Sequence, residues 1–213
     1  MRIFGVDPGI ANFGWAVVKV DEKQTQLLGV GVFAPESHRQ TTIRMIKTRA
    51  GGTKRKREPV PGSLSTAEND TQRCGQIFEF VVKKLGELDV DGGVAIEDRT
   101  VNAAWAGALK MAQSGVLVAI ECARLACGFE RRDLIPVKDV HFALGVKVPR
   151  GVDPKQLVES AVRAEITDCS LVEAINPKSL RVHVYDAIAV ILAATRLEYA
   201  RLYQRGWHAR STR

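Results

Sequence analysis

Apolar residues occur along the chain either in short runs or at helical spacing, and the short runs predict β-strands. Strands are expected at residues 2–6, 13–20, 26–33, 94–97 and 133–137. The polar stretch 21–23 predicts a hairpin turn, so the first three strands should form an antiparallel meander. Pro136 lacks an amide donor, which favours an edge position for the last strand.

Helical spacing predicts the other elements. Residues 65–68 (STAE) have the form of a capping box and should begin a helix. Residues 103–127 are Ala-rich and apolar around most of the helix, which indicates burial on two sides, one that would face the sheet and another that could face a partner subunit. Asp153 and Pro154 suit the start of a third helix, and a last helix is expected over 182–204. The prediction is an α/β fold in which helices flank a mixed five-stranded sheet, with an antiparallel meander followed by parallel strands.

Two segments fall outside this pattern, and both are basic. Residues 34–64 contain several Pro and Gly residues and are expected to form an irregular loop, longer than an ordinary connection. Eight Lys or Arg and no acid lie between Arg39 and Arg57, and a basic C-terminal tail is expected over about 205–213. With a net charge of +7, these segments favour a polyanionic partner. Lys54, Arg55, Lys56 and Arg57 could grip phosphates, or they could simply be solvated.

Length and composition narrow the class of protein. The 213 residues suit a single domain over 1–213, with the 34–64 stretch as an insertion. No apolar run approaches the roughly 20 residues of a membrane span, and the N-terminus does not have the pattern of a signal peptide. The cysteines form no C-x-x-C pair, which favours free thiols in a reducing compartment over a zinc site. We therefore expect a cytoplasmic, nucleoid-associated protein, or its equivalent in an organelle or a phage-infected cell.

Acidic residues end two of the predicted strands. Asp7 follows the first strand and Glu97 ends the fourth, and parallel neighbouring strands would lie about 4.8 Å apart. His183 and Asp186 are three residues apart and share a face at the start of the last helix. Two carboxylates this close repel each other unless a cation neutralises them, and oxygen ligands favour Mg²⁺ or Mn²⁺ over zinc.

Each of these residues also has a simpler interpretation. Asp7 could form an Asx-type turn with Pro8 and Gly9, and Glu97 could be a solvated loop acid beside Asp98. His183 and Asp186 could cap their helix. The order of these residues along one chain favours a shared site.

Four segments of the chain contain motifs that can be compared with those of a known family. The first is residues 3–9 (IFGVDPG), which are followed by the strand that begins at 13 (FGWAVV). The second is 94–97 (VAIE), and the third is 108–116 (ALKMAQSGV) in the long helix. The fourth is 183–190 (HVYDAIAV). In this order, and spread over most of the chain, they resemble the motifs of RuvC-type Holliday-junction resolvases, with the fourth segment similar to the family's final motif.

The resemblance implies an RNase H-like fold, a homodimer formed through the helix at about 103–127, and two Mg²⁺ ions per active site that Mn²⁺ can replace. The matching metal-binding and catalytic positions are Asp7, Glu97, His183 and Asp186. The matching DNA-binding positions are Lys138, Lys155 and Thr100, the last where the family often has an aromatic residue. A lysine in a first helical turn opposes the helix dipole, so Lys155 also favours a phosphate at that helix N-terminus, with a simple exposed lysine as the alternative.

The function implied by the resemblance is resolution of four-way DNA junctions by paired symmetric nicks, through two-metal phosphodiester hydrolysis that gives a 5′-phosphate and a 3′-hydroxyl. A homodimer matches the two-fold symmetry of such a substrate. One alternative is a related RNase H-like nuclease that acts on forks, flaps or RNA–DNA hybrids. Another is a non-catalytic junction-binding protein of the same fold.

Overall fold

The computed structural model describes residues 1–21, 24–37, 41–47, 53–60, 64–98, 107–149 and 151–211. Side chains are described within 1–21, 24–37, 64–98, 112–149 and 151–197, and at residue 60. In this part of the chain no helix is long and apolar enough to cross a membrane.

The centre of the fold is a five-stranded sheet with the order β3-β2-β1-β6-β7. Its strands are β1 (Arg2–Asp7), β2 (Phe13–Val20), β3 (Thr25–Phe33), β6 (Val94–Asp98) and β7 (Arg132–Pro136). The pairs β1–β2 and β2–β3 are antiparallel, whereas β1–β6 and β6–β7 are parallel. This confirms the predicted meander followed by parallel strands, and β7 is at the sheet edge as Pro136 predicted.

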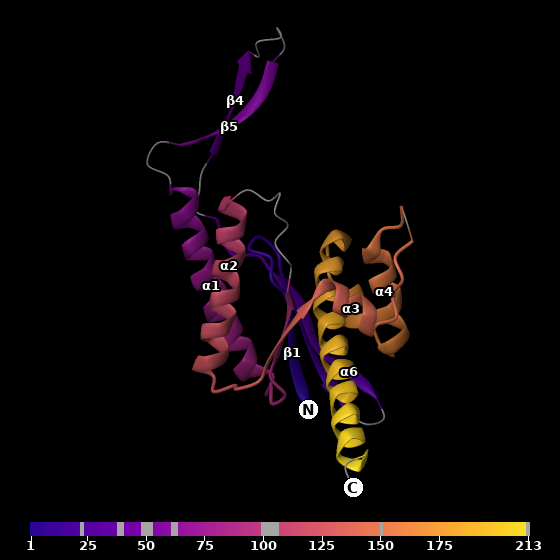
Figure 1. Cartoon of the computed structure of the whole chain (residues 1–213). Coiled ribbons are helices and arrows are strands. Elements are labelled where there is room, and N and C mark those ends of the chain that lie inside the picture. The colour runs from indigo at the N-terminus through magenta and orange to yellow at the C-terminus, as the bar shows by residue number, and fades with distance from the viewer. Residues whose placement is uncertain are drawn as a thin grey trace.

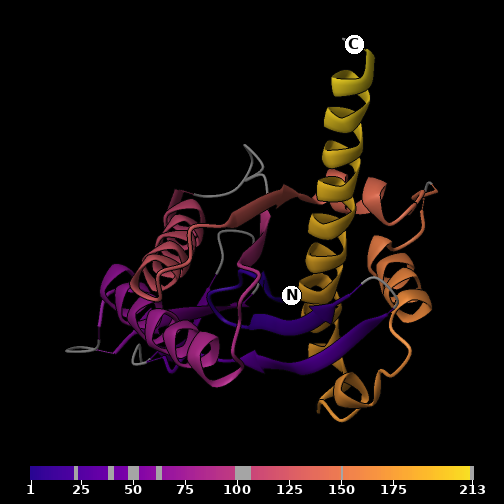
Figure 2. The same ribbon diagram turned by 90° about the horizontal axis from the view of Figure 1, so that it is seen from below.

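Helices cover both faces of the sheet (Figures 1 and 2). One face is covered by α1 (Thr66–Glu87) and α2 (Gly107–Ala126), which pack against each other. The other face is covered by α6 (Arg181–Ser211), with α3 (Val137–Ala143) and α4 (Pro154–Glu165) packed against it. Two short elements, α5 (Ser170–Glu173) and the 3₁₀ helix η1 (Lys178–Leu180), lead into α6.

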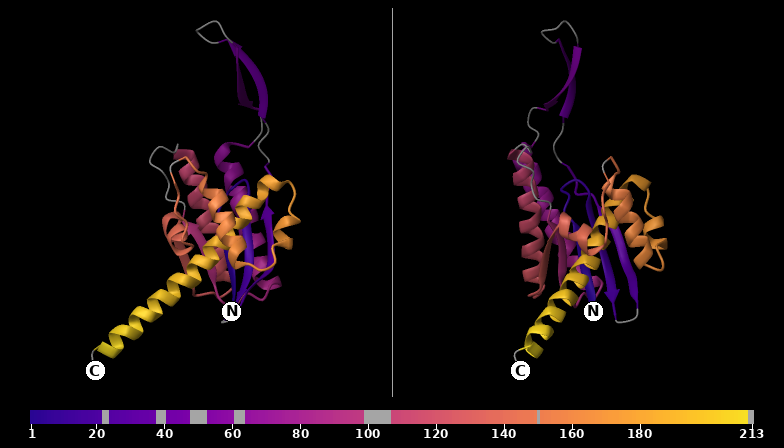
Figure 3. Two further views of the ribbon diagram at one scale, coloured as in Figure 1. Left: turned by 90° about the vertical axis from the view of Figure 1, so that its right-hand side faces the viewer. Right: turned by 45° about the vertical axis from the view of Figure 1, so that its right-hand side comes forward.

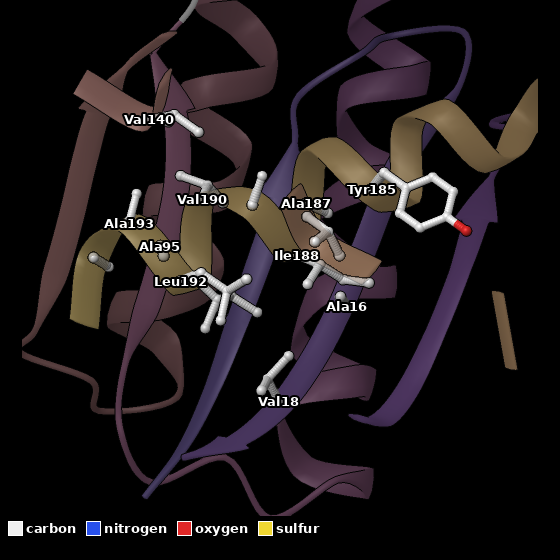
Figure 4. Packing of buried hydrophobic residues seen from close by; sticks show 14 of the residues in the cluster. Ala16, Val18, Ala95, Val140, Tyr185, Ala187, Ile188, Val190, Leu192 and Ala193 are labelled. Carbon is white, nitrogen blue, oxygen red and sulfur yellow. The ribbon is translucent and has the colours of Figure 1, made fainter. Parts of the chain in front are cut away.

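A separate hydrophobic core lies on each face. Phe4 and Val17 of the sheet pack with Ile77 of α1 and Ile120 of α2 in one core. In the other core, residues such as Ala16 and Val18 pack against the buried first half of α6 (Figure 4). Because residues that alternate along a strand point to opposite faces, the short runs of β1 and β2 serve both cores.

Two helices begin as the sequence predicted. Ser65 accepts a hydrogen bond from the Glu68 amide and donates its own amide to the Glu68 carboxylate, which completes a capping box for α1. Asp153 caps α4 by accepting from the Lys155 amide, with Pro154 in the first turn. The predicted long helix is confirmed as α2, which begins at Gly107 and ends at Ala126. Residues 103–106 of the prediction lie outside the described residues.

The prediction of an irregular loop over 34–64 was wrong for residues 41–47 and 53–59. β4 (Thr41–Lys47) and β5 (Thr53–Pro59) pair in antiparallel fashion and form a sheet of their own. The resulting β4–β5 hairpin projects from the body (Figure 1). Within the described part of the chain, the two strands pair only with each other and belong to no larger sheet, so they lack the apolar alternation by which a strand on a core is recognised.

The predicted C-terminal tail also differs, because α6 continues as a helix through Ser211 instead of ending near 204. Its last turns project from the body at the end opposite the β4–β5 hairpin (Figure 3). The sequence prediction also missed α3, α5 and η1, which are only 7, 4 and 3 residues long. Elements this short show too few turns for a helical period to be visible.

Candidate metal centre

Three carboxylates meet at one end of the sheet. Asp7 is the last residue of β1, Glu97 lies near the end of β6, and Asp186 lies in the second turn of α6. One oxygen from each lies within 4.8 Å of the others. All three side chains are buried, with Asp7 0%, Glu97 8% and Asp186 9% exposed. The structure therefore brings together three of the four residues that the sequence predicted as metal ligands.

Strand pairing places the first two carboxylates. β1 and β6 are parallel neighbours, and Val6 lies opposite Ile96 in their register. Asp7 and Glu97 each follow one of these paired residues, so they occupy equivalent positions on adjacent strands. The sequence argument depended on this pairing, which the structure confirms.

Two glycines allow α6 to lie directly on these strands. A Cβ atom at Gly14 of β2 would overlap the carbonyl group of His183, and one at Gly5 of β1 would overlap the carbonyl oxygen of Ala187. The first turns of α6 can therefore approach the sheet only where these two residues have no side chain. This close approach brings Asp186, which is distant in the sequence, to Asp7 and Glu97.

His183 contacts Asp7 directly. The distance between His183 Nδ1 and Asp7 Oδ2 is 2.7 Å, and the imidazole is one-fifth exposed. His183 is not one of the three residues in the mutually close set of ligand atoms. Its described contact is a hydrogen bond that orients the Asp7 carboxylate, a role often taken by residues around a metal ligand.

Lys155 approaches the same site from α4. Its Nζ atom lies 3.4 Å from Asp186 Oδ2, although about half of the lysine side chain is exposed. Solvent screens such a pair, so its contribution to stability is small. The contact places a positive charge at the rim of the carboxylate cluster, where it could meet a phosphate.

The chemistry of the donor set fits a divalent cation with a preference for oxygen. Three carboxylates buried this close together repel one another, and burial removes the water that would screen them. A cation such as Mg²⁺ or Mn²⁺ offsets both the repulsion between the carboxylates and their loss of hydration. Carboxylate oxygens are the ligands that these ions prefer. Asp7, Glu97 and Asp186 could hold such ions, with His183 beside them.

Gln113 is a residue whose contribution the sequence analysis missed. Its side-chain amide, buried in α2, donates a hydrogen bond of 2.9 Å to the carbonyl oxygen of Pro8. This bond links α2 to the turn that follows Asp7, and the Gly9 amide donates to the Asp7 carbonyl oxygen in the same turn. A polar residue inside an Ala-rich helix was the signal that could have identified it.

The remaining predicted DNA-binding residues are less closely placed. Lys138 is exposed near the start of α3, two residues beyond Pro136, which lies opposite Asp98 at this end of the sheet. Lys54, Arg55, Lys56 and Arg57 belong to β5, whose backbone alone is described. Thr100 lies outside the described residues.

The comparisons with known proteins give structural matches only. No protein-family model matches the chain, and no curated protein matches its sequence. The structure of Thermus thermophilus RuvC superposes with a TM-score of 0.61 at 23% identity, covering 95% of this chain and 96% of RuvC. T. thermophilus RuvC in complex with a Holliday junction substrate gives a TM-score of 0.62 at the same identity and coverage. A human cytomegalovirus terminase nuclease domain, Mn-soaked and inhibitor-bound, gives 0.42 at 13% identity, covering 92% and 82% of the two chains.

The two RuvC structures match the chain over almost its whole length, and the mixed sheet flanked by helices is the one that the sequence predicted. The chain therefore has the RNase H-like fold of RuvC.

Proposed function

We propose that this protein is a metal-dependent endonuclease that resolves four-way DNA junctions by paired symmetric nicks. The observation that carries the proposal is the buried cluster of Asp7, Glu97 and Asp186 at the carboxyl ends of β1 and β6. A buried cluster of carboxylates destabilises the metal-free fold, so its presence indicates a functional site. Here the cluster lies on the fold of RuvC. T. thermophilus RuvC has been solved with a Holliday junction substrate, which favours branched DNA as the substrate here.

Asp7, Glu97 and Asp186 would hold two Mg²⁺ ions, for which Mn²⁺ could substitute. Such ions supply the activation of a water molecule and neutralise the charge that develops on the departing 3′ oxygen. His183 would keep the Asp7 carboxylate in position through its Nδ1 hydrogen bond and complete the site. The products would be a 5′-phosphate and a 3′-hydroxyl.

Exposed cations near this site would position the DNA. Lys155 lies beside Asp186 at the N-terminus of α4, and Lys138 lies near the start of α3. A phosphate at the start of α4 would meet both the lysine charge and the helix N-terminus. Contacts of this kind orient a nucleic acid without reading its sequence. We include Thr100 among the proposed DNA contacts, on the resemblance alone.

A homodimer would supply the two active sites that paired nicks require. The outer surface of α2 carries the exposed apolar side chains of Val118 and Leu125, which are 60% and 63% exposed. Beside Val118, α1 and α2 line a cavity of about 420 Å³ with mostly apolar walls that include Ala112 and Gly115. An apolar groove next to exposed apolar residues is typical of a protein interface, so we assign this face of α2 to the dimer.

Two other functions stay open within the same fold. A related nuclease acting on forks, flaps or RNA–DNA hybrids would use the same three carboxylates. A protein that binds junctions without cutting them would not need a buried carboxylate cluster, so this alternative is disfavoured.

The deciding experiment is a nicking assay with Mg²⁺ on a synthetic four-way junction, alongside a linear duplex and a fork, with Asp7→Asn as the control. Symmetric paired nicks that disappear in Asp7→Asn, while junction binding persists, would support the proposal. Cleavage of the fork or duplex in preference to the junction would exclude junction specificity and favour the related nuclease. Tight junction binding without cleavage in Mg²⁺ or Mn²⁺ would favour the binding protein.

A further inference from the structure

The chain enters and leaves the β4–β5 hairpin at the end of the main sheet where the carboxylate cluster lies. β3 runs in the same direction as β1, because each is antiparallel to β2. Phe33, the last residue of β3, lies opposite Phe13 of β2. Gly14, which follows Phe13 in β2, lies opposite Asp7 of β1. The chain therefore leaves the sheet for the hairpin at the same end as Asp7, two strands away from it, and it returns to α1 at that end (Figure 1).

Each strand of the hairpin has seven residues, so the ribbon is about 23 Å long at the usual rise of a strand. Among the described strands, it pairs with none of those in the main sheet, and it extends away from the body in each view (Figures 1 and 3). An isolated two-stranded ribbon is only marginally stable in water. The structure therefore suggests a ligand that stabilises the hairpin outside the protein's own core.

The register divides the cations of the hairpin equally between its two faces. Residues that lie opposite each other in an antiparallel pair share a face, and the faces alternate along each strand. One face, called the Arg44 face below, contains the positions of Arg44, Lys54 and Lys56. The other, called the Arg55 face, contains those of Lys47, Arg55 and Arg57. A hairpin that packed on a protein core would have one apolar face, and this one has three cations on each.

The pairing also puts two like charges opposite each other. Arg44 lies directly opposite Lys56, an arrangement that destabilises a sheet because the two charges repel. A polyanion would neutralise this repulsion. Duplex DNA carries about one negative charge per 1.7 Å of its axis, so a stretch as long as the hairpin presents many phosphates.

We propose that the β4–β5 hairpin is a two-sided DNA arm that lies between two duplex arms of a branched substrate, with the Arg44 face on one duplex and the Arg55 face on the other. A straight duplex can meet only one face of a ribbon at a time, whereas two helices that diverge from a branch point can meet both. This proposal rests on the proposed function for the choice of branched DNA. It adds the surface that would distinguish branched from linear DNA.

The test uses two variants with equal loss of charge, R44Q/K54Q/K56Q and K47Q/R55Q/R57Q, and the combination of the two. All are made in the Asp7→Asn background so that binding can be followed in Mg²⁺ without cleavage. The affinities for a four-way junction and for a linear duplex are measured over a range of salt concentrations. A third variant, K19Q/K83Q/R132Q, removes the same charge from positions near the other end of the sheet.

For the junction, each single-face variant should lower affinity by about tenfold or more and reduce the slope of log affinity against log salt by about 2 to 3. For the duplex, each single-face variant should have little effect, because the intact face can take over, and only the combined variant should lose affinity. K19Q/K83Q/R132Q should resemble the parent protein on both substrates. The charge-conserving R44K/K54R/K56R should bind the junction normally, which would separate loss of charge from loss of folding.

Junction binding that depends on one face alone, or single-face losses that are equal on junction and duplex, would overturn the two-sided arrangement. Unchanged junction binding in the combined variant would exclude the hairpin as a DNA contact. These outcomes are independent of the nicking assay: paired nicks could be found with an inert hairpin, and a two-sided hairpin could be found in a protein that makes no nicks.

Discussion

The imidazole of His183 lies against the carboxylate of Asp7, with 2.7 Å between Nδ1 and Oδ2, although 176 positions separate the two residues in the sequence. The contact joins the start of α6 to the end of β1. It restrains a carboxylate whose orientation a metal site would require.

Replacing His183 with Ala should leave Asp7 buried but less well oriented. We expect the rate of metal-dependent junction cleavage to fall by about 10- to 100-fold, with a higher Mg²⁺ concentration needed for half-maximal rate. The measurement is the initial nicking rate over a Mg²⁺ titration. His141→Ala, in the last turn of α3, is the matched control and should behave as the parent protein. An unchanged titration in His183→Ala would contradict the orienting role.

Replacing Glu97 with Gln should make the metal-free protein more stable. It removes one of three buried carboxylates that lie within 4.8 Å of one another, and it leaves the bond between His183 and Asp7 in place. Thermal unfolding in EDTA should therefore show a higher Tm for the variant. Added Mg²⁺ should raise the Tm of the parent protein more than that of the variant, since an ion that binds only the folded state stabilises it. Equal Mg²⁺ shifts in both would argue against Glu97 as a ligand.

Replacing Gly14 with Ala should disturb the contact between β2 and α6. The new Cβ would overlap the His183 carbonyl group, and we expect a loss of about 1–3 kcal/mol in the free energy of unfolding. Cleavage should fall as well, because the start of α6 carries His183 and Asp186. Gly75→Ala is the control: Gly75 lies within α1, where an added methyl group would meet open space, so stability should rise by about 1 kcal/mol. Denaturant unfolding of both variants makes the comparison.

Charge on the outer face of α2 should separate the proposed dimer. Val118→Glu and Leu125→Glu each place a carboxylate on an exposed apolar surface, and either should shift the protein from dimer to monomer in sedimentation at micromolar concentration. Phe142→Glu is the control, because Phe142 is 80% exposed and belongs to α3. A protein that is monomeric before mutation, or a dimer that survives both changes in α2, would exclude this interface.

Tyr185 should make stability depend on alkaline pH. Burial raises the pKa of its hydroxyl to about 12, against about 10 in an unfolded chain. The folded state holds this proton more tightly, so the stabilisation is complete below about pH 10 and is lost as the pH rises from 10 towards 12. Tyr185→Phe should lack this part of the alkaline decline. Urea midpoints at pH 8 and pH 11 would show it, and a parallel decline in both proteins would contradict it.

Tyr185→Phe should also be slightly stabilising at neutral pH. The Tyr185 hydroxyl is buried, and within the described residues no hydrogen-bond partner is found for it. Phenylalanine keeps the packing of the ring and removes a polar group whose burial is costly, for a gain on the order of 1 kcal/mol. A marked loss of stability at pH 8 would show that the hydroxyl is satisfied in solution.

The sequence predicted the central sheet and the position of the carboxylates because both follow from local rules. β2 was predicted with its observed bounds, and Asp7 and Glu97 were found because each lies at or next to the end of a buried strand. The pairing of β1 with β6 could only be assumed, since it joins segments about 90 residues apart. The contacts of Lys155 with Asp186 and of Gln113 with Pro8 could not be foreseen, because tertiary packing alone creates them.

The β4–β5 hairpin was missed for a different reason. Its strands contain mainly polar and basic residues, so neither face shows the apolar alternation by which a strand on a core is identified. The helix over 205–211 was missed because the last helix was expected to end near 204, before a basic C-terminal tail. In both cases the basic residues that suggested a polyanionic partner stood in place of the apolar residues by which a strand or a helix is predicted.

The order of elements along the chain has a consequence for when the protein can first act. β1, which carries Asp7, leaves the ribosome before the other elements described here, and α6, which carries Asp186, leaves after them. A nascent chain that has been synthesised only as far as α4 contains the sheet but lacks the third carboxylate and the histidine beside Asp7. If the cluster is the catalytic centre, translation itself delays the appearance of a DNA-cutting activity until α6 has docked on Gly5 and Gly14.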